Sequence, residues 1–265
     1  MRKWRLLIQP DLPGSTQMAI DEALYLQANP ARPPVLRFYT WQNPTLSLGF
    51  FQNYKRVVSE PFIRHNKIAV VRRITGGRAV LHDKEVTYAL AGALADEFGH
   101  QSLKETYSVI AQALNLGLQS LGIEEAYSSG DPAGAVRESG LPQCFVTVSQ
   151  YEISKGDRKM IGSAQKRARD RFVQHGSILL NFDKRLQNGC ILNPDPTIEE
   201  KIAPLSWILQ RELQWEQLIP HFIKGFEQQF EVELELSELT EQERKLMRAL
   251  EPVYQSIEWT QSGCR

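Results

Sequence analysis

The sequence predicts an α+β fold in which mixed or antiparallel β-sheets are flanked by helices. Short apolar runs typical of strands dominate the first two-thirds of the chain, with only a few helical segments among them. These runs do not follow the strand–helix–strand rhythm of a doubly wound parallel sheet. Because no internal repeat, low-complexity segment or clear linker interrupts the 265 residues, we expect one domain over 1–265, mainly helical from about residue 197.

The N-terminal part of the chain is expected to combine strands with one helix. Ser15 is a candidate N-cap for a helix over 16–28, which the proline-rich stretch 29–34 ends. Asp21 and Glu22 lie early in this helix, where the helix dipole favours carboxylates. The strands are expected at apolar runs bounded by turn residues, at 4–9, 35–39, 45–48, 68–71 and 86–90.

The remaining elements are expected to be strands followed by helices. Apolar residues at helical spacing predict a helix over 104–121 that stops at Gly122. The stretch 128–142 is rich in glycine, serine and proline and should form an irregular loop. Extended segments are expected at 145–153, 159–163 and 172–180, with a turn at 155–157. Helices are expected at 212–230 and 240–250.

Charge and composition limit the binding partners and the cellular compartment that we expect for this protein. The chain has 31 basic and 31 acidic residues, so its zero net charge favours neither nucleic acid nor an anionic membrane. No run approaches the roughly 18 uninterrupted apolar residues that a membrane helix needs. Cys144, Cys190 and Cys264 are odd in number and far apart, which argues against disulfides and zinc. We therefore expect a cytoplasmic protein without a bound metal, in which a cysteine such as Cys190 is a small buried residue.

The most informative stretch is a cationic loop with two adjacent glycines, Arg72-Arg73-Ile74-Thr75-Gly76-Gly77-Arg78-Ala79-Val80-Leu81-His82-Asp83. Adjacent glycines allow backbone angles closed to other residues and let a ligand lie against the main chain. Two arginines precede them and a third follows, so the loop suits a carbonyl, a carboxylate or a phosphate. A hairpin uses the same glycines, so a plain turn is the alternative.

A second block also carries candidate site residues. It is Asp157-Arg158-Lys159-Met160-Ile161-Gly162-Ser163-Ala164-Gln165-Lys166-Arg167, followed by Gln174-His175-Gly176-Ser177-Ile178-Leu179-Leu180. Lys159 lies at the entry of a strand whose small residues could form the wall of a pocket. A lysine there could contact an acyl carbonyl and stabilise negative charge developing on it. The alternative is a solvated basic hairpin with a buried second strand.

Together the two blocks resemble the signatures of the biotin/lipoate ligase and octanoyltransferase superfamily, over roughly residues 4–180. The resemblance implies the biotin/lipoate protein ligase catalytic-domain fold, with Lys159 contacting the acyl group. It implies that His82 orients the loop or lines the acyl pocket, and that His175 lines the pocket or has a structural role. The substrate-binding residues that it implies are Arg72, Arg73, Thr75, Gly76, Gly77, Arg78, Ala79, His82, Gly162, Ser163, Ala164, His175 and Gly176.

Within the superfamily, three features are similar to the octanoyltransferases rather than to the ATP-using lipoate ligases. Arg78 stands where the ligases usually have a third glycine, and the tail after Trp207 is short for their accessory domain. Cys144 stands in a Cys-Phe pair upstream of Tyr151-Glu152, where the similar transferases have their nucleophile. The resemblance thus implies that Cys144 attacks as a thiolate, which a nearby Lys159, with help from His82 or His175, could favour.

The resemblance implies a cofactor-free acyl transfer. The octanoyl group would move from octanoyl-acyl carrier protein to Cys144, and then to a lysine of a lipoyl-domain protein such as the glycine-cleavage H protein. The alternatives are an ATP-dependent lipoate-protein ligase and a non-catalytic acyl- or lipoyl-domain-binding protein. The basic residues Lys166, Arg167, Arg169 and Arg171 form either a solvated face or a docking surface for an acidic partner.

Overall fold

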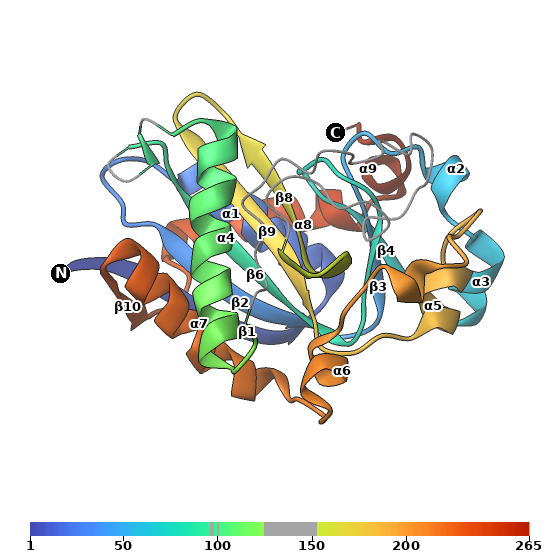
Figure 1. Ribbon diagram of the computed structural model, residues 1–265. Helices are drawn as coiled ribbons and strands as arrows, with labels where there is room; N and C mark the ends of the chain where they lie inside the picture. The colour runs from blue at the N-terminus through green and yellow to red at the C-terminus, as the bar shows by residue number, and fades with distance from the viewer. Residues whose placement is uncertain (96–97, 100, 125–152, 265) are drawn as a thin grey trace.

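The computed structural model describes residues 1–95, 98–99, 101–124 and 153–264. The described strands form two sheets, one of seven strands and one of three. The larger sheet runs in the order β10-β1-β2-β6-β9-β8-β7 and the smaller in the order β4-β3-β5 (Figure 1). The loop expected at 128–142, Cys144 and most of the extended segment expected at 145–153 lie outside the described residues.

The larger sheet is mixed and is flanked by helices, which confirms the predicted fold class. β1 is parallel to both of its neighbours, β2 and β10, whereas the pairs from β2 to β7 are antiparallel. β1 and β2 can be parallel because α1, Gly14–Gln27, crosses between them. The strands of this sheet are β1 (Arg2–Leu12), β2 (Val35–Trp41), β6 (Glu85–Ala93), β7 (Ile153–Lys155), β8 (Arg158–Arg167), β9 (Arg171–Leu179) and β10 (Val232–Leu236).

The smaller sheet decides the geometry of the glycine loop. It consists of β3 (Thr45–Leu48), β4 (Ala69–Arg72) and β5 (Val80–His82), with β3 between the other two. The loop 73–79 joins β4 to β5 and therefore passes over the end of β3. The interpretation as a plain hairpin turn is wrong, because the strands that the loop joins are not neighbours. The apolar run expected at 86–90 belongs instead to β6 of the larger sheet.

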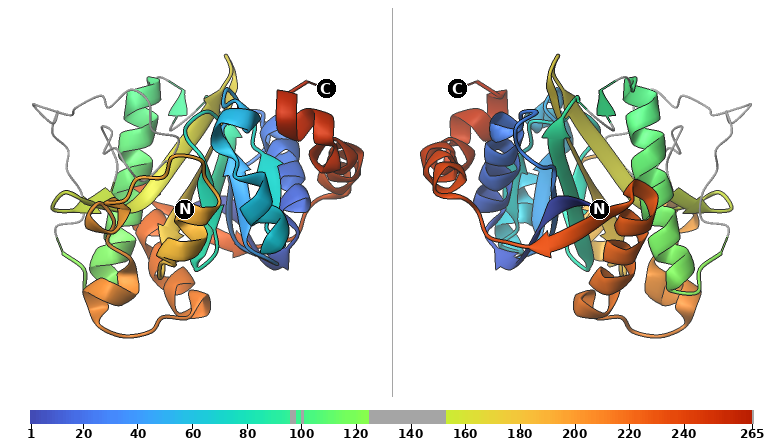
Figure 2. Two further views of the ribbon diagram at one scale, coloured as in Figure 1. Left: turned by 90° about the vertical axis from the view of Figure 1, so that its right-hand side faces the viewer. Right: turned by 90° about the vertical axis from the view of Figure 1, so that its left-hand side faces the viewer.

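Helices cover both faces of the larger sheet (Figure 2). On one face, α4 (Leu103–Ser120) and α7 (Trp215–Phe230) pack against the strands through a core rich in aromatic side chains. On the other face, α1 and α8 (Glu241–Gln255) form a second core with the sheet. Because α1 is enclosed by the sheet and α8, ten of its residues are buried, including the carboxylates of Asp21 and Glu22.

Shorter helices surround the smaller sheet and the C-terminus. α2 (Tyr54–Val57), α3 (Glu60–His65) and α5 (Lys184–Gly189) contribute to a separate core with the smaller sheet. Cys190 follows α5 inside this core and is fully buried, which confirms the structural role expected for it. A 3-10 helix at Ile198–Glu200, α6 (Leu205–Leu209) and α9 (Ile257–Ser262) complete the described helices.

Three expectations for the elements are corrected. Ser15 does not cap α1, because the helix already begins at Gly14 with Pro13 as its N-cap, whose carbonyl accepts from the N–H of Gln17 at 2.9 Å. The helix expected from residue 212 begins at Trp215. The C-terminal portion also contains a strand, β10, which pairs in parallel with β1. Its five residues follow α7 after one intervening residue and are too few for a distinct pattern.

Candidate active site

A cleft lies where the two sheets meet α1. Strands β2, β6, β8 and β9 of the larger sheet form one side, and β3 and β5 of the smaller sheet form the other. Its lining combines apolar side chains with hydroxyl and imidazole groups. The lining residues are Met18, Tyr39, Trp41, Ser47, Arg73, Val80, His82, Thr87, Gly162, Ser163, Ala164, His175, Gly176 and Ser177. Seven of the predicted site residues thus lie together at this cleft: Arg73, His82, Gly162, Ser163, Ala164, His175 and Gly176.

The glycine loop packs directly on the main chain that leaves β3. A Cβ built on Gly49 would lie 2.0 Å from the carbonyl oxygen of Gly77, so only glycine permits this approach. Gly77 itself has a φ of 88°, in the left-handed region that favours glycine. The loop is joined to the strand end by a hydrogen bond of 2.9 Å from the N–H of Phe50 to the carbonyl of Thr75. The loop conformation is therefore set by backbone contacts as well as by its side chains.

Arg73 holds the loop from within. Its side chain is buried, and its guanidinium donates to the carbonyls of Gly76 at 2.9 Å and Arg78 at 2.7 Å. It also donates to the carbonyl of Ser47 at 3.0 Å, to Ser47 Oγ at 3.1 Å and to Thr75 Oγ1 at 3.1 Å. These five contacts occupy the five N–H groups of a guanidinium. Arg73 thus lies at the cleft as predicted, but its donors bind the loop and β3.

Arg72 points away from the cleft. Its guanidinium donates to the carbonyls of Trp259, Thr260 and Gln261 in α9 and to the carbonyls of three residues that follow β3, Gly49, Phe50 and Gln52. The indole of Trp259 donates back to the carbonyl of Arg72 at 2.9 Å. We therefore assign Arg72 the attachment of the C-terminal helix, in place of the substrate contact expected from the sequence.

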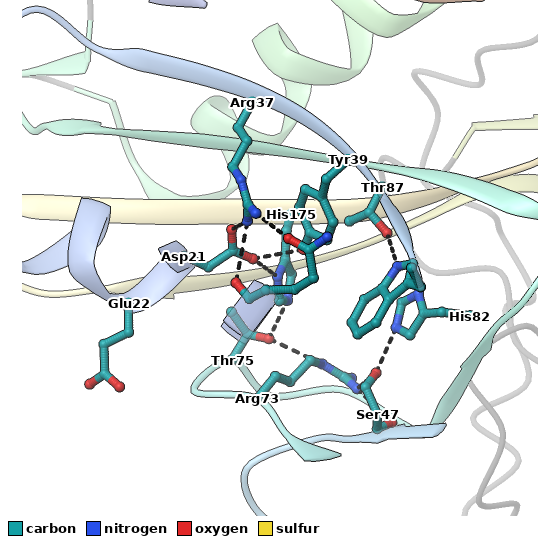
Figure 3. A network of polar contacts seen from close by, with 12 residues as sticks. Asp21, Glu22, Arg37, Tyr39, Ser47, Arg73, Thr75, His82, Thr87 and His175 are labelled. Atoms are coloured by element: carbon teal, nitrogen blue, oxygen red, sulfur yellow. Dashed lines mark hydrogen bonds and ion pairs between the residues drawn. The ribbon is translucent and has the colours of Figure 1, made fainter. Parts of the chain in front are cut away.

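A chain of hydrogen bonds joins the loop to α1 (Figure 3). Thr75 Oγ1 lies 2.7 Å from Nε2 of His175, and Nδ1 of His175 lies 3.1 Å from Oδ2 of Asp21. The carboxylate only accepts, so His175 donates from Nδ1, and in its neutral form it accepts at Nε2. Thr75 must then donate its hydroxyl hydrogen to His175 while its oxygen accepts from Arg73. Asp21 thereby fixes the direction of every bond in the chain.

A second chain of the same kinds of groups reaches Arg73 from the other side, and Figure 3 shows its hydroxyl and its imidazole. Ser47 Oγ lies 2.8 Å from Nε2 of His82, and Nδ1 of His82 lies 3.2 Å from Oε1 of Glu85. The imidazole of His82 also stacks on Trp41, with ring centroids 4.0 Å apart. Both chains run from hydroxyl to imidazole to carboxylate, and both hydroxyls accept from Arg73.

The surroundings of the two hydrogen-bond chains favour a charged carboxylate at Asp21 in the first and a neutral imidazole at His82 in the second. Burial alone would raise the pKa of Asp21, but Arg37, His175 and Tyr39 outweigh it and hold the pKa below its ordinary value. The Nη1 of Arg37 lies 2.7 Å from Oδ1 of Asp21, with both side chains buried. Burial, together with the nearby Arg73, lowers the pKa of His82 despite Glu85. His82 is therefore neutral at pH 7.

The other predicted residues occupy the strands beside the cleft. Ala164 pairs with His175 and Ser163 with Gly176 across β8 and β9. A Cβ on Gly176 would lie 2.6 Å from Ser163 Oγ, so the strands approach closely here. In the loop, Gly76 and Arg78 are partly exposed and Gly77 is exposed, whereas Ala79 is buried in the core of the smaller sheet.

Lys159 lies farther along β8. It is fully buried, and its main chain bonds to the carbonyl of Lys201 at 2.8 Å and the N–H of Ala203 at 2.9 Å. It lies three positions before Gly162, which corresponds to about 10 Å along a strand. The solvated basic hairpin is therefore wrong for Lys159, which is covered by the segment 201–203.

The basic residues 166–171 do not act as one open patch. Arg167 donates to Thr106 Oγ1 at 3.0 Å, and Arg171 donates to the carbonyl of Leu26 at 2.7 Å and pairs with Asp170. Lys166 lies over the rings of Tyr25 and Phe50, 5.8 and 5.6 Å from their centroids. Arg169 is exposed. Three of the four basic side chains thus have partners within the chain.

Sequence reasoning missed the carboxylates behind the two histidines. In the sequence, Asp21 is only an acidic residue near a helix start, and no motif singles out Glu85. The available signal for Asp21 is its place in Ala19-Ile20-Asp21-Glu22-Ala23-Leu24, where charged residues interrupt an apolar run.

Among the described residues, no group of three or more His, Cys, Asp or Glu side chains could hold a metal ion. No described helix is long and apolar enough to cross a membrane.

The comparisons with known proteins agree with this fold and motif set. A family model of the lipoyl protein ligase A/B catalytic domain matches residues 13–227, and the chain therefore belongs to this family. The chain is 38% identical to the Octanoyltransferase LipM of Carboxydothermus hydrogenoformans, over 98% of each chain. It is 36% identical to the Octanoyltransferase LipM of Bacillus cereus, over 97% of each.

Solved structures of lipoate ligases share the fold. Lipoate-protein ligase A bound with ATP superposes with a TM-score of 0.83 at 23% identity, over 98% of this chain and 99% of that one. The bi-partite lipoate protein ligase of Thermoplasma acidophilum superposes with a TM-score of 0.82 at 22% identity, over 100% of this chain and 98% of that one. The catalytic-domain fold expected from the sequence is thereby confirmed.

Proposed function

We propose that this chain is an octanoyltransferase of lipoate biosynthesis. It takes the octanoyl group from octanoyl-acyl carrier protein onto Cys144 as a thioester and passes it to a lysine of a lipoyl-domain protein, such as the glycine-cleavage H protein. The observation that carries the proposal is that relatives named octanoyltransferase are 32–38% identical to the chain over nearly its full length. The ligase structures, at 22–23% identity, support the shared fold alone.

The transfer balances in two steps without a cofactor. In the first, Sγ of the Cys144 thiolate attacks the thioester carbonyl, a new C–S bond forms, and the carrier leaves as its thiolate and takes up a proton. In the second, the acceptor lysine attacks the same carbonyl as a neutral amine. The C–N bond forms, the bond to Cys144 breaks, and the proton lost by the amine balances the released thiolate. One thioester replaces another before the amide forms, so ATP is not needed.

Some of the described residues would stabilise charge in this reaction, and others would form the wall of the cleft. Lys159 is fully buried on β8, and its ammonium form would stabilise the oxyanion and favour the thiolate of Cys144. The two histidines are committed to the hydroxyls of Thr75 and Ser47, so we assign them to the cleft wall rather than to proton transfer. Apolar side chains such as Met18 would contact the acyl chain.

Intact-mass measurement after incubation with octanoyl-acyl carrier protein tests the proposal. Without ATP, the parent protein should gain the mass of one octanoyl group, and neutral hydroxylamine should remove it because it cleaves thioesters. Cys144→Ser should gain no hydroxylamine-sensitive mass, and Cys190→Ser should behave like the parent.

The alternatives give other results in the same experiment. A ligase would activate free octanoate or lipoate only with ATP and would not acylate itself from the carrier. A binding protein would gain no covalent mass under either condition. A thioester that persists in Cys144→Ser and disappears in Cys190→Ser would overturn the assignment of the nucleophile.

A further inference from the structure

One hydroxyl in the cleft has no partner among the described residues. Ser177 lines the cleft and is buried, with 2% of its surface exposed, yet its Oγ makes no hydrogen bond. A buried polar group without a partner destabilises the fold, because it has lost its hydrogen bonds to water and gained none. Ser177 therefore stands out as a group that a bound ligand could satisfy.

The other hydroxyls that line the cleft are already used. Ser47 lies 2.8 Å from His82, and Ser163 lies 2.8 Å from the hydroxyl of Tyr88. Thr87 donates to Glu85 at 2.7 Å and accepts from the indole of Trp41. The hydroxyl of Tyr39 donates to Asp21 at 2.8 Å. The network of the cleft thus leaves the hydroxyl of Ser177 available for a ligand.

The place of Ser177 in the sheet gives a ligand room to reach it. Ser177 and His175 are two residues apart on β9, so both side chains point to the cleft face. Its cross-strand partner on β8 is Gly162, which has no side chain to cover it. Ser177 also lies two residues farther from the glycine loop than His175, in the direction of Lys159 on β8.

From these contacts we infer that Ser177 binds the acyl carbonyl, donating its Oγ–H to the carbonyl oxygen of the octanoyl group. This inference deepens the proposed function and rests on it. An octanoyl thioester has seven hydrocarbon carbons beside its carbonyl, and the carbonyl oxygen is its one strong hydrogen-bond acceptor. As the carbonyl becomes tetrahedral in each transfer step, the oxygen gains negative charge and the bond from Ser177 strengthens. Ser177 is then a substrate-contacting residue in addition to the proposed Lys159.

Single-turnover acylation of the 265-residue chain tests this inference. Octanoyl-acyl carrier protein is mixed with the parent, Ser177→Ala or Ser206→Ala, and the acyl-enzyme is followed by intact mass. Ser206 is the matched control because its Oγ is also buried without a partner but lies on α6, outside the cleft lining. Ser177→Ala should slow acylation on the order of 100-fold, as for the loss of one oxyanion donor, and Ser206→Ala should not.

A binding measurement separates failure of the inference from failure of the proposed function. Octanamide retains the carbonyl but cannot react, and its Kd is measured for the same three proteins by calorimetry. Ser177→Ala should bind it roughly 5-fold more weakly, the effect of one hydrogen bond. If the parent is never acylated but this difference appears, the proposed function fails and the contact stands. Equal Kd values and equal acylation rates for the parent and Ser177→Ala would overturn the inference, as would an equal loss in Ser206→Ala.

Thermal unfolding excludes a folding defect as the cause. Because the hydroxyl of Ser177 has no partner, its removal breaks no hydrogen bond within the described structure. The melting temperatures of both alanine variants should therefore equal or exceed that of the parent. A drop confined to Ser177→Ala would show that its hydroxyl supports the fold and would count against a ligand contact.

Discussion

Replacing Asp21 with asparagine removes the negative charge that pairs with Arg37. The two side chains are 2% and 0% exposed, and the loss of one partner from a buried pair typically costs about 3–5 kcal/mol. Arg37 keeps Gln9 Oε1 at 2.6 Å and the ring of Tyr39 at 4.0 Å, which places the expected cost at the lower end. We expect the free energy of unfolding of Asp21→Asn to fall by about 3 kcal/mol.

The same substitution should also disturb the glycine loop. An asparagine amide that donates to Nδ1 of His175 would force the other ring nitrogen to become the donor. Thr75 would then receive hydrogens from both His175 and Arg73, and its own hydroxyl hydrogen would lose its acceptor. The rate of acyl-enzyme formation should therefore fall together with stability.

Urea unfolding of Asp21→Asn and Glu22→Gln is the assay. Glu22 is also buried on α1, but its carboxylate accepts from the hydroxyl of Tyr254 at 2.6 Å and points away from the network (Figure 3). Glutamine keeps an acceptor for Tyr254, so Glu22→Gln should lose clearly less stability. Equal losses in the two variants would refute the assignment of Asp21 as the carboxylate that neutralises Arg37.

The pH dependence gives an independent check on Asp21. Its pKa in the folded protein lies below the ordinary value of 3.8, so the folded state releases this proton more readily than the unfolded state. The resulting stabilisation is fully present above pH 3.8 and is lost as the pH falls toward the folded pKa. The stability difference between the parent and Asp21→Asn should therefore shrink below about pH 4.

Three further predictions concern the loop, the buried thiol and the lysine. Gly49→Ala should lower the melting temperature, since its Cβ would lie 2.0 Å from the carbonyl oxygen of Gly77. Gly76→Ala should not lower it, since a Cβ there meets nothing within 4 Å. Similar melting temperatures for the two variants would contradict this packing. Cys190 should resist iodoacetamide at pH 8 in the folded protein, because burial and Asp83 raise its pKa to about 12; labelling at the rate of Cys264, which is exposed, would show otherwise. Lys159→Ala should slow acyl transfer on the order of 100-fold. Lys166→Ala should be close to the parent, because it loses contacts with the rings of Tyr25 and Phe50. Equal rates for the two variants would show that Lys159 does not belong to the site.

The sequence by itself determined the fold class and the family of this protein. The informative signals are contiguous, because the loop from Arg72 to Asp83 and the block from Asp157 to Arg167 each occupy one short segment. The helix over 104–121 was also predictable, since its apolar spacing, its stop at Gly122 and its length are local properties. Local patterns of this kind can be recognised without knowing which segments are in contact in the folded protein.

Tertiary structure alone decided what the loop residues do. Arg72 and Arg73 are adjacent and chemically identical, yet one binds α9 and the other binds the glycine loop, because successive residues at the end of a strand point to opposite faces. The distance in sequence between Asp21 and His175 is 154 residues, and only the stacking of α1 on β9 brings them together. No local pattern encodes such a contact, since it depends on the packing of helices and strands that the chain places far apart.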